Sequence, residues 1–269
     1  MSFHPLLRTL QPGAAAQAAG IARGYAGPPA RTVGVRYGPA RMRCASLLKP
    51  LYAWAAAGFI RDVARWRMHA EPAISYSSNV DTLNLWLSVG PPEILRVLAE
   101  RTGVSWTPFP GDPTRFGSVE VSAEEVATAY AALGQAALAG DPVADEVVRL
   151  MQEVPEGQSF GARRAVCSAG APIKCGWYGG PDETCLRTHA VALMLHRGMR
   201  VVVAVAMTAQ PFTDPAERAI YAEQIDEGEP VEHHHEKVGG ELLRGLLSRT
   251  VDELGEGPDG RSELRAARK

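Results

Sequence analysis

The chain has 269 residues, of which 46% are hydrophobic and 22% are charged, and its formal charge is −2 at pH 7. This composition is typical of a globular protein and excludes a disordered chain. The slightly negative charge, with no basic stripe, argues against a nucleic-acid partner. No apolar run is long enough for a membrane span, and residues 1–27 lack the pattern of a secretory signal. We therefore expect a cytoplasmic protein without a membrane partner.

Three scarce residue types constrain the motifs. The four cysteines lack C-x-x-C spacing, so we expect reduced thiols, no structural zinc site and no cofactor. Most basic residues are arginine, and the sequence has only four lysines and two asparagines. The lysines are Lys49, Lys174, Lys237 and Lys269, and the asparagines are Asn79 and Asn84. Motifs that require Lys or Asn are therefore rarely expected by chance in this chain.

The chain begins with a predicted helix and a predicted strand. Residues 1–27 are Ala-rich and predict an amphipathic helix, broken at Pro12 and Gly13. Residues 31–37 alternate apolar and polar side chains and predict a strand that ends at a Gly-Pro turn. The first strand of a sheet is thus expected shortly before the most informative motif.

The middle of the chain is predicted to be helical. The signals are apolar periodicity, Pro in the first turn, and capping residues such as Ser122 with Glu125 three positions later. A polar elbow is expected over residues 73–79, and a loop rich in Pro and Gly over residues 106–117. The helices are expected over residues 46–58, 59–69 and 80–88, from residue 91 onward, and over residues 122–138 and 141–154.

The last third of the chain changes to strands. Residues 171–177, 188–195 and 199–207 predict three strands, the last two joined by a tight turn as an antiparallel hairpin. A polar, acidic stretch over residues 211–236 precedes a final helix over residues 238–254. The whole pattern predicts an α+β fold, with an antiparallel sheet from both chain ends, terminal helices on it and an all-helical insertion.

The first chemical motif is Ser46-Leu47-Leu48-Lys49 at the start of an apolar helix. A spacing of three places both polar side chains on one helical face. The helix N-terminus offers backbone N–H groups to a developing negative charge. A hydroxyl, a nearby amine and such donors are what an activated nucleophile needs, so Ser46 and Lys49 are candidate catalytic residues.

Two further motifs follow in the chain. Ser77-Ser78-Asn79 supplies a hydroxyl and an amide on the elbow, able to relay a proton and to bind a substrate amide. Lys174-Cys175-Gly176 lies on a predicted strand, where the glycine lets a substrate backbone approach closely. A second K-x-G at Lys237 begins a helix and is discarded. Each motif alone is weak, since Ser and Asn are also ordinary turn residues.

Together, S-x-x-K, S-x-N and K-x-G in this order resemble the class A β-lactamase and D-alanyl-D-alanine peptidase superfamily. The resemblance covers residues 30–254 and implies a β-lactamase-like fold. It implies that Ser46 is the acyl-enzyme nucleophile, Lys49 its proton acceptor and Ser77 a proton shuttle. It also implies substrate-binding roles for Asn79, Lys174, Cys175, Gly176 and Trp177, with the N–H groups of Ser46 and Trp177 as the oxyanion hole.

The resemblance also implies a domain division. Residues 1–29 would form an N-terminal helix packed on the sheet, residues 30–254 the catalytic domain, and residues 255–269 a flexible tail. The helical part is expected at about 46–165 and the sheet part at about 30–43 and 170–254.

The sequence departs from that family in three ways. No asparagine follows Asn84, so the E-x-x-N arrangement that holds the deacylating water is absent; Glu120 lies in that region but is expected to be solvated. Cys175 stands where the family has a hydroxyl for the substrate carboxylate, and a thiol is a weak donor. As a nucleophile Cys175 is disfavoured, because no histidine partner is evident. Finally, the segment between Ser46 and Ser77 is shorter than the corresponding segment of class A enzymes.

Residues 233–235 are three consecutive histidines that invite a metal interpretation. Adjacent histidines on a loop cannot all face one ion, and no spaced ligand completes a set. We expect an exposed polar loop and no metal.

Three functions remain open from the sequence. The leading one is a serine hydrolase that acts through a Ser46 acyl-enzyme on a small amide, ester or lactam, with poor β-lactam turnover. The second is an acyltransferase that passes the acyl group to an amine. The third is a non-catalytic binding module that retains the fold.

Overall fold

The computed structural model describes residues 3–24, 31–179, 185–196 and 200–255. Helices and strands follow the order α1 (His4–Leu7), β1 (Ala15–Gly24), β2 (Arg31–Tyr37), β3 (Met42–Arg43), α2 (Lys49–Ala56), α3 (Val63–Ser75), α4 (Asn79–Val89), α5 (Pro91–Thr102), β4 (Glu120–Val121), α6 (Ala123–Leu138), α7 (Pro142–Gln152), α8 (Ala162–Ala165), β5 (Ile173–Tyr178), β6 (Cys185–His196), β7 (Arg200–Pro211), α9 (Pro215–Glu227), α10 (Glu232–His235) and α11 (Glu241–Glu253). The α+β fold expected from the sequence is confirmed.

The main sheet has five antiparallel strands in the order β2-β1-β7-β6-β5. Both chain ends contribute to it, since β1 and β2 come from the first forty residues and β5 to β7 from the last hundred. The short strands β3 and β4 form a separate pair. The hairpin between β6 and β7 is confirmed, while the expected turn at residues 196–198 lies, beyond His196, outside the described residues.

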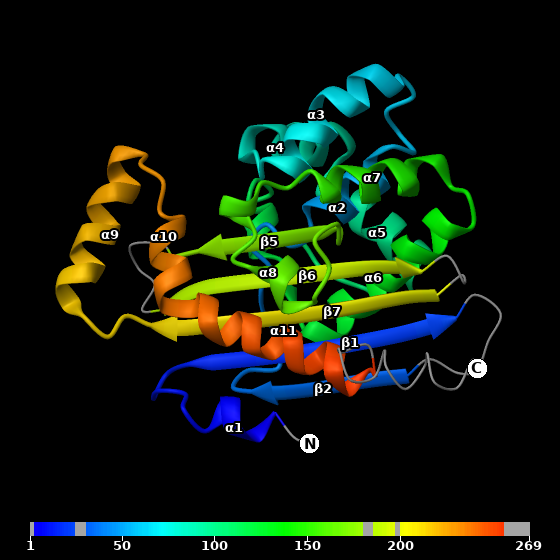
Figure 1. The fold of residues 1–269 in the computed structure, drawn as a ribbon. Helices are drawn as coiled ribbons and strands as arrows, with labels where there is room; N and C mark the ends of the chain where they lie inside the picture. Colours follow the sequence, from blue (N-terminus) through cyan, green and yellow to red (C-terminus); the bar gives the residue numbers. More distant parts are fainter. Residues whose placement is uncertain (1–2, 25–30, 180–184, 197–199, 256–269) are drawn as a thin grey trace, which may run out of the picture.

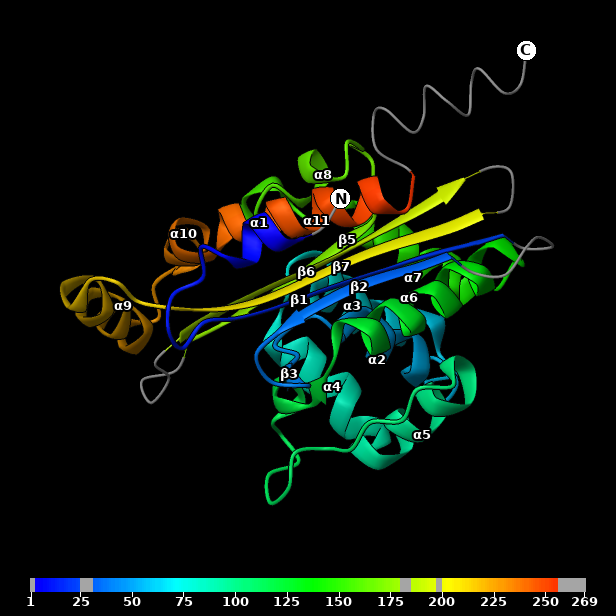
Figure 2. The ribbon, with the colours of Figure 1, turned by 90° about the horizontal axis from the view of Figure 1, so that it is seen from below.

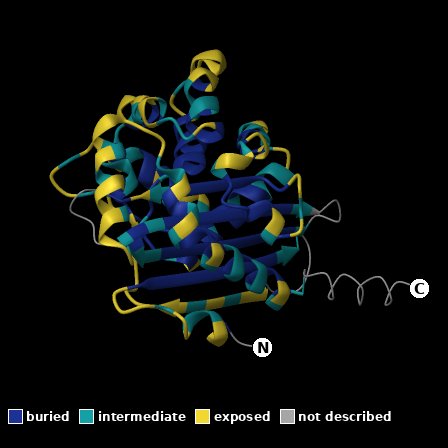
Figure 3. Ribbon diagram, turned by 60° about the vertical axis from the view of Figure 1, so that its left-hand side comes forward, coloured by how far each residue is buried: buried dark blue, intermediate teal, exposed yellow. Residues whose placement is uncertain are grey.

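Helices cover both faces of the sheet (Figures 1 and 2). One face carries α1, α8 and α11, and the other carries the block α2 to α7. Each face has its own apolar cluster; Leu243 and Val251 of α11 are buried in one, and Leu51 of α2 and Val126 of α6 in the other. The central strands are buried on both sides, whereas β2 at the edge is mostly exposed (Figure 3). No described helix is long and apolar enough to cross a membrane.

The predicted N-terminal helix is wrong. Residues Ala15–Gly24 form β1, which pairs with β2 on one side and β7 on the other. Alanine has a high helix propensity, but tertiary pairing overrides it here. Small side chains let helices pack closely on this strand: a Cβ at Gly20 would lie 2.5 Å from a methyl carbon of Thr250 on α11. The alanines of β1 serve close sheet–helix packing.

The acidic stretch before the last helix also differs from expectation. It forms α9, which projects beyond the end of the strands, and the short α10 (Figure 1). Asp214 caps α9, accepting a hydrogen bond from the N–H of Ala216, and Pro215 occupies its first turn. Asp141 and Pro142 begin α7 in the same way, so the Asp-Pro signal predicts a helix start at both places, although the acidic composition of residues 211–236 indicates a loop.

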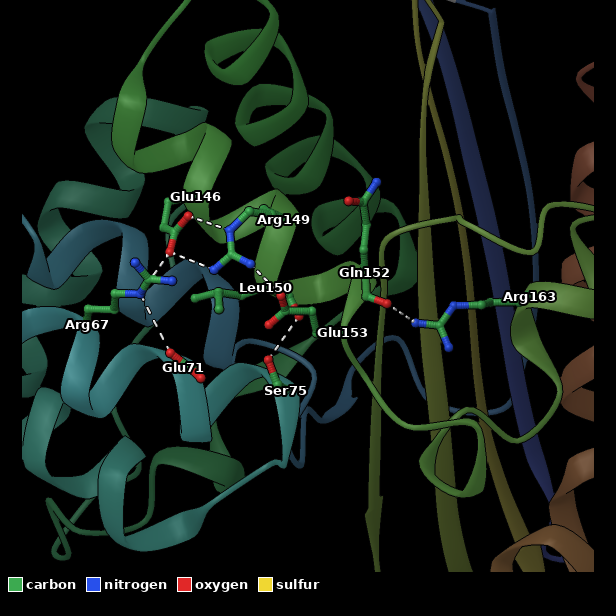
Figure 4. Close-up of polar contacts among 9 residues, drawn as sticks. All are labelled: Arg67, Glu71, Ser75, Glu146, Arg149, Leu150, Gln152, Glu153 and Arg163. Atoms are coloured by element: carbon green, nitrogen blue, oxygen red, sulfur yellow. Dashed lines mark hydrogen bonds and ion pairs between the residues drawn. The ribbon is translucent and has the colours of Figure 1, made fainter.

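Helix α7 ties the helical block to the rest of the molecule (Figure 4). The buried guanidinium of Arg163 on α8 donates to two carbonyls, each at 2.8 Å. One belongs to Gln152, the last residue of α7, and the other to Val154, just beyond the helix. On its other side, the hydroxyl of Ser75 at the end of α3 donates to the carbonyl of Leu150 at 3.0 Å. These bonds fix the end of α3, from which the predicted elbow departs.

Candidate active site

Ser46 lies in the turn that precedes α2, just before the first helical residue, Lys49. The expected helix over residues 46–58 therefore begins only at Lys49. The turn is held by its neighbours: the N–H of Ala45 donates to the carbonyl of Gly117 at 2.9 Å, and the Tyr130 hydroxyl donates to the carbonyl of Leu47 at 2.6 Å. Ala45 has a φ of +49°, a strained conformation of the kind found at functional sites.

Lys49 is fully buried beside this turn. Its Nζ donates to the carbonyl of Ser77 and to Oδ1 of Asn79, the latter at 2.8 Å, and lies 3.4 Å from the Ser77 hydroxyl. Burial lowers the pKa of Lys49 to about 6, and the positive charge of Lys174 contributes in the same direction. The amine is thus held by the elbow and is largely neutral at pH 7.

The elbow that carries Ser77 lies between α3 and α4. Ser77 has a φ of +58°, the second strained non-glycine position at this site. The N–H of Ser78 donates to the carbonyl of Pro72 at 3.0 Å, and its hydroxyl caps α4. With Ser75 anchored to α7 on the other side (Figure 4), both ends of the elbow are fixed, so Ser77 is presented at a defined place.

Strand β5 brings the third motif to the same place. Lys174 is buried, and burial lowers its pKa to about 7. Gly176 lies directly against the Ser46 turn, since a Cβ there would be 2.7 Å from the amide nitrogen of Ser46 and 2.8 Å from that of Leu47. A side chain at this position would displace the backbone of the candidate nucleophile.

The structure does not bring Cys175 into the site. Side chains alternate along a strand, so Cys175 faces the opposite side of the sheet from Lys174 and Gly176. Its buried thiol lies in the cluster under α11 and donates to the carbonyl of Ser159 at 3.4 Å. Burial raises the pKa of this thiol to about 12. The expected substrate contact of Cys175 is therefore wrong, and the thiol is a core group.

A pocket of about 290 Å³ opens where these segments meet. It is lined by Arg43, Ala45, Ser46, Ser77, Asn79, Thr114, Arg115, Phe116, Gly117, Ser118, Trp177, Tyr178 and Arg187. Four predicted site residues thus line it, while Lys49 and Lys174 are buried behind it. Trp177 also packs edge-on against Phe160, with ring centroids 5.4 Å apart.

The comparison with solved structures identifies the fold. A β-lactamase from Burkholderia vietnamiensis is 16% identical, with 93% of each chain covered and a TM-score of 0.57. One from Chitinophaga pinensis is 11% identical, covering 93% of this chain and 95% of that one, with a TM-score of 0.58. A class A β-lactamase from Bacteroides cellulosilyticus is 13% identical, with coverages of 91% and 95% and a TM-score of 0.57. The chain has the class A β-lactamase fold. No model of a known family matches the sequence, and no curated protein does.

Within this class A β-lactamase fold, the loop before β4 forms one side of the pocket without a carboxylate. Thr114, Arg115 and residues Phe116–Ser118 line it. Glu120, the acid of this region, is exposed on β4 and is not among the lining residues. The sequence predicts a loop over residues 106–117 but does not place it against the Ser46 turn, because that contact depends on a hydrogen bond between Ala45 and Gly117, which lie far apart in the chain.

The three histidines are not the exposed loop that we expected. They belong to α10, and His234 and His235 are buried. His235 contacts the hydroxyls of Thr188 on β6 and Tyr221 on α9, at 3.1 and 3.2 Å. In the described part of the chain, no three His, Cys, Asp or Glu side chains are placed to hold a metal. These histidines tie the α9–α10 segment to the sheet of the class A β-lactamase fold.

Proposed function

We propose that this chain is a serine acyl-transfer enzyme that forms an acyl-enzyme on Ser46. One observation carries the proposal: a buried, largely neutral lysine, bonded to Ser77 and Asn79, lies behind a pocket that Ser46 lines. A desolvated amine next to a hydroxyl is a suitable general base. A binding module that merely retained the fold would gain nothing from burying a lysine at this cost.

In the proposed reaction, Oγ of Ser46 forms a bond to the carbonyl carbon of the substrate, and its proton goes to the neutral amine of Lys49. The N–H groups of Ser46 and Trp177 stabilise the oxyanion. Collapse of the tetrahedral intermediate breaks the bond to the leaving group. The proton on Lys49 reaches that group through the Ser77 hydroxyl, 3.4 Å away. Asn79 and Lys174 bind the acyl group.

Release of the acyl group distinguishes the two chemical versions of this proposal. None of the described residues that line the pocket is Asp or Glu, so this part of the lining supplies no carboxylate to activate a water. We infer slow hydrolysis and poor turnover of β-lactams. An amine acceptor would need less activation, which keeps the acyltransferase as the second candidate.

Intact-protein mass spectrometry tests the proposal directly. The full chain is incubated with a fluorophosphonate and, separately, with a labelled penicillin, and the adduct is mapped by proteolysis. We expect a stoichiometric fluorophosphonate adduct on Ser46, absent in Ser46→Ala; Ser118→Ala, which alters another serine of the same pocket, is the matched control. No adduct with either reagent would identify a binding module and refute the proposal.

A second measurement separates hydrolysis from transfer. Once Ser46 is acylated by an activated ester, loss of the adduct is followed in buffer alone and with added primary amines. Faster loss together with an amide product would establish transfer, whereas a rate independent of amine would establish hydrolysis.

A further inference from the structure

The strand β2 is an open edge of the main sheet. It pairs with β1 over seven consecutive residues without a bulge, and no other described strand lies on its outer side. Its residues are exposed or half-buried (Figure 3). The outer N–H and C=O groups of such a strand are a template for another strand. Natural edges are often protected by proline, lysine or a bulge, and β2 has none of the three.

A groove of about 560 Å³ lies beside this edge, where β2 meets the first turn of α6. Gly34 and Arg36 of β2 line it together with Glu124 of α6. Glu124 reaches over Gly34, since a Cβ at Gly34 would lie 3.2 Å from Oε1 of Glu124. In the described part of the chain neither Arg36 nor Glu124 has an ion-pair partner, whereas the neighbouring Arg41 pairs with Glu125. The groove therefore contains an unpaired charge of each sign.

The sequence of β2 is complementary to itself in one antiparallel register. When two copies pair about a two-fold axis at Gly34, every residue of the strand lies opposite a residue of the partner. The opposed pairs are Arg31 with Tyr37, Thr32 with Arg36, and Val33 with Val35. An arginine stacks on a tyrosine ring, and opposed β-branched side chains stabilise a sheet. No two arginines are opposed, so this register has no like-charge pair.

The same register brings the two unpaired charges together across the axis. Val33 and Val35 pack against the cluster under α11. Side chains alternate along a strand, so Gly34 and Arg36 face the α6 side. The partner's Arg36 is then a diagonal neighbour of Gly34, about 7–8 Å away and within reach of a long side chain. Because Gly34 has no side chain, that guanidinium can enter the groove and pair with Glu124. The two-fold axis forms this ion pair twice.

We propose that β2 is a dimer interface, through which two copies of this chain form one continuous sheet. The partner is a second copy rather than an unrelated strand, because one register complements both the side chains of β2 and the charges of the groove. Two strands of seven residues bury less area than an obligate interface, so the dissociation constant should be micromolar. No residue of β2 lines the Ser46 pocket, so the inference is independent of the proposed function.

Analytical ultracentrifugation of the full chain, between about 1 and 300 µM, tests for the dimer. We expect association that increases with concentration and weakens as salt is raised. Arg36→Glu and Glu124→Arg each oppose like charges at both ion pairs and should weaken association at least about tenfold. The double variant Arg36→Glu/Glu124→Arg restores opposite charges and should recover most of it. Arg61→Glu, which reverses an exposed charge outside the groove, is the matched control. Circular dichroism verifies that each variant is folded.

Cysteine cross-linking tests the register. Residue 34 meets its own copy at the axis, where opposed Cα atoms are about 4.5–5.5 Å apart, a distance that a disulfide spans. Gly34→Cys should therefore give a covalent dimer on oxidation with copper phenanthroline. Thr32→Cys should not, because the two copies of residue 32 are offset by four residues, about 13 Å along the strand. The unsubstituted chain, with its exposed Cys167, measures the background.

Three outcomes would overturn the inference. The chain could remain monomeric over the whole concentration range, or it could dimerise with no response to either charge reversal. Alternatively, Thr32→Cys could cross-link as readily as Gly34→Cys. None of these measurements involves Ser46, so this inference and the proposed function fail independently of each other.

Discussion

The pocket has two walls that are built on different principles. The helical wall consists of Ser46, Lys49, Ser77 and Asn79, and the sheet wall of Lys174, Gly176, Trp177 and Arg187. On the helical wall, Lys49 is joined directly to the elbow by hydrogen bonds, and the turn and the elbow each contain a residue with positive φ. On the sheet wall, strand register sets the positions, and Gly176 acts through the absence of a side chain.

The two walls are therefore expected to contribute differently to the proposed reaction. The helical wall holds its reactive groups by side-chain contacts and strained backbone, so single substitutions there should change the chemical step. On the sheet wall, the paired strands hold Gly176 against the Ser46 turn and place positively charged side chains at fixed positions. Substitutions there should therefore change the acylation rate by displacing the groups of the site.

The largest effect is expected on the helical wall. Lys49→Met removes the candidate base, and acylation by a neutral ester should fall roughly 10²- to 10⁴-fold. Lys49→Arg should not rescue it, because a guanidinium does not deprotonate. Nitrophenol release measures the rate, and circular dichroism verifies folding. Near-normal acylation in a folded Lys49→Met protein would remove Lys49 from the mechanism.

The matching change on the sheet wall is Gly176→Ala. Its Cβ would lie 2.7 Å from the amide nitrogen of Ser46, so the turn that carries Ser46 must shift. We expect acylation to fall on the order of 10²-fold with Lys49 intact. The control is Gly157→Ala, where no atom lies within 4 Å of the added Cβ. If the Gly176→Ala protein is acylated as fast as the wild type, the close contact between Gly176 and the Ser46 turn has no role in acylation.

The pH dependence of acylation tests the state of the base. Since burial lowers the pKa of Lys49 to about 6, the active neutral amine is formed as the pH rises through 6. Acylation should therefore increase about tenfold per pH unit below 6 and level off above 7. Stopped-flow rates with a neutral ester between pH 4.5 and 9 measure this profile. A rise only near pH 10 would show that Lys49 is not the base.

The sequence predicted the helical wall better than the sheet wall. Lys49, Ser77 and Asn79 are singled out because lysine and asparagine are scarce in this chain, and hydrogen bonds join the three side chains in the structure. Cys175 was misplaced because the K-x-G motif was treated as a unit, although the alternation of a strand puts its middle residue on the opposite face.

Other features depend on pairings that no local pattern contains. The alanines of Ala15–Gly24 have the composition of a helix, and only the strands on both sides make them a strand. Arg115 belongs to the pocket because the segment around it bonds to the Ser46 turn, as at Ala45 and Gly117. The burial of His234 and His235 likewise depends on α9, whose acidic composition indicated a loop.

The buried histidines next to the sheet are expected to affect stability rather than acylation. Burial lowers the pKa of His189 to about 4 and that of His235 to about 3, the latter also through His234. The N–H of Thr208 donates to Nδ1 of His189, so the proton is on Nε2, which donates to the carbonyl of Arg43. Both histidines are neutral when folded at pH 5 and protonated when unfolded.

Stability should therefore be fully present above about pH 6.5 and fall as the pH drops towards 4, because the unfolded chain binds more protons. The loss is on the order of 3 kcal/mol per histidine at most. Urea unfolding at pH 7 and pH 4.5 measures it. His235→Gln should reduce the difference between the two pH values, and His4→Gln on the exposed α1 should not. An equal pH dependence in wild type and His235→Gln would mean that His235 does not carry this effect, and that the sheet wall is stabilised by other groups.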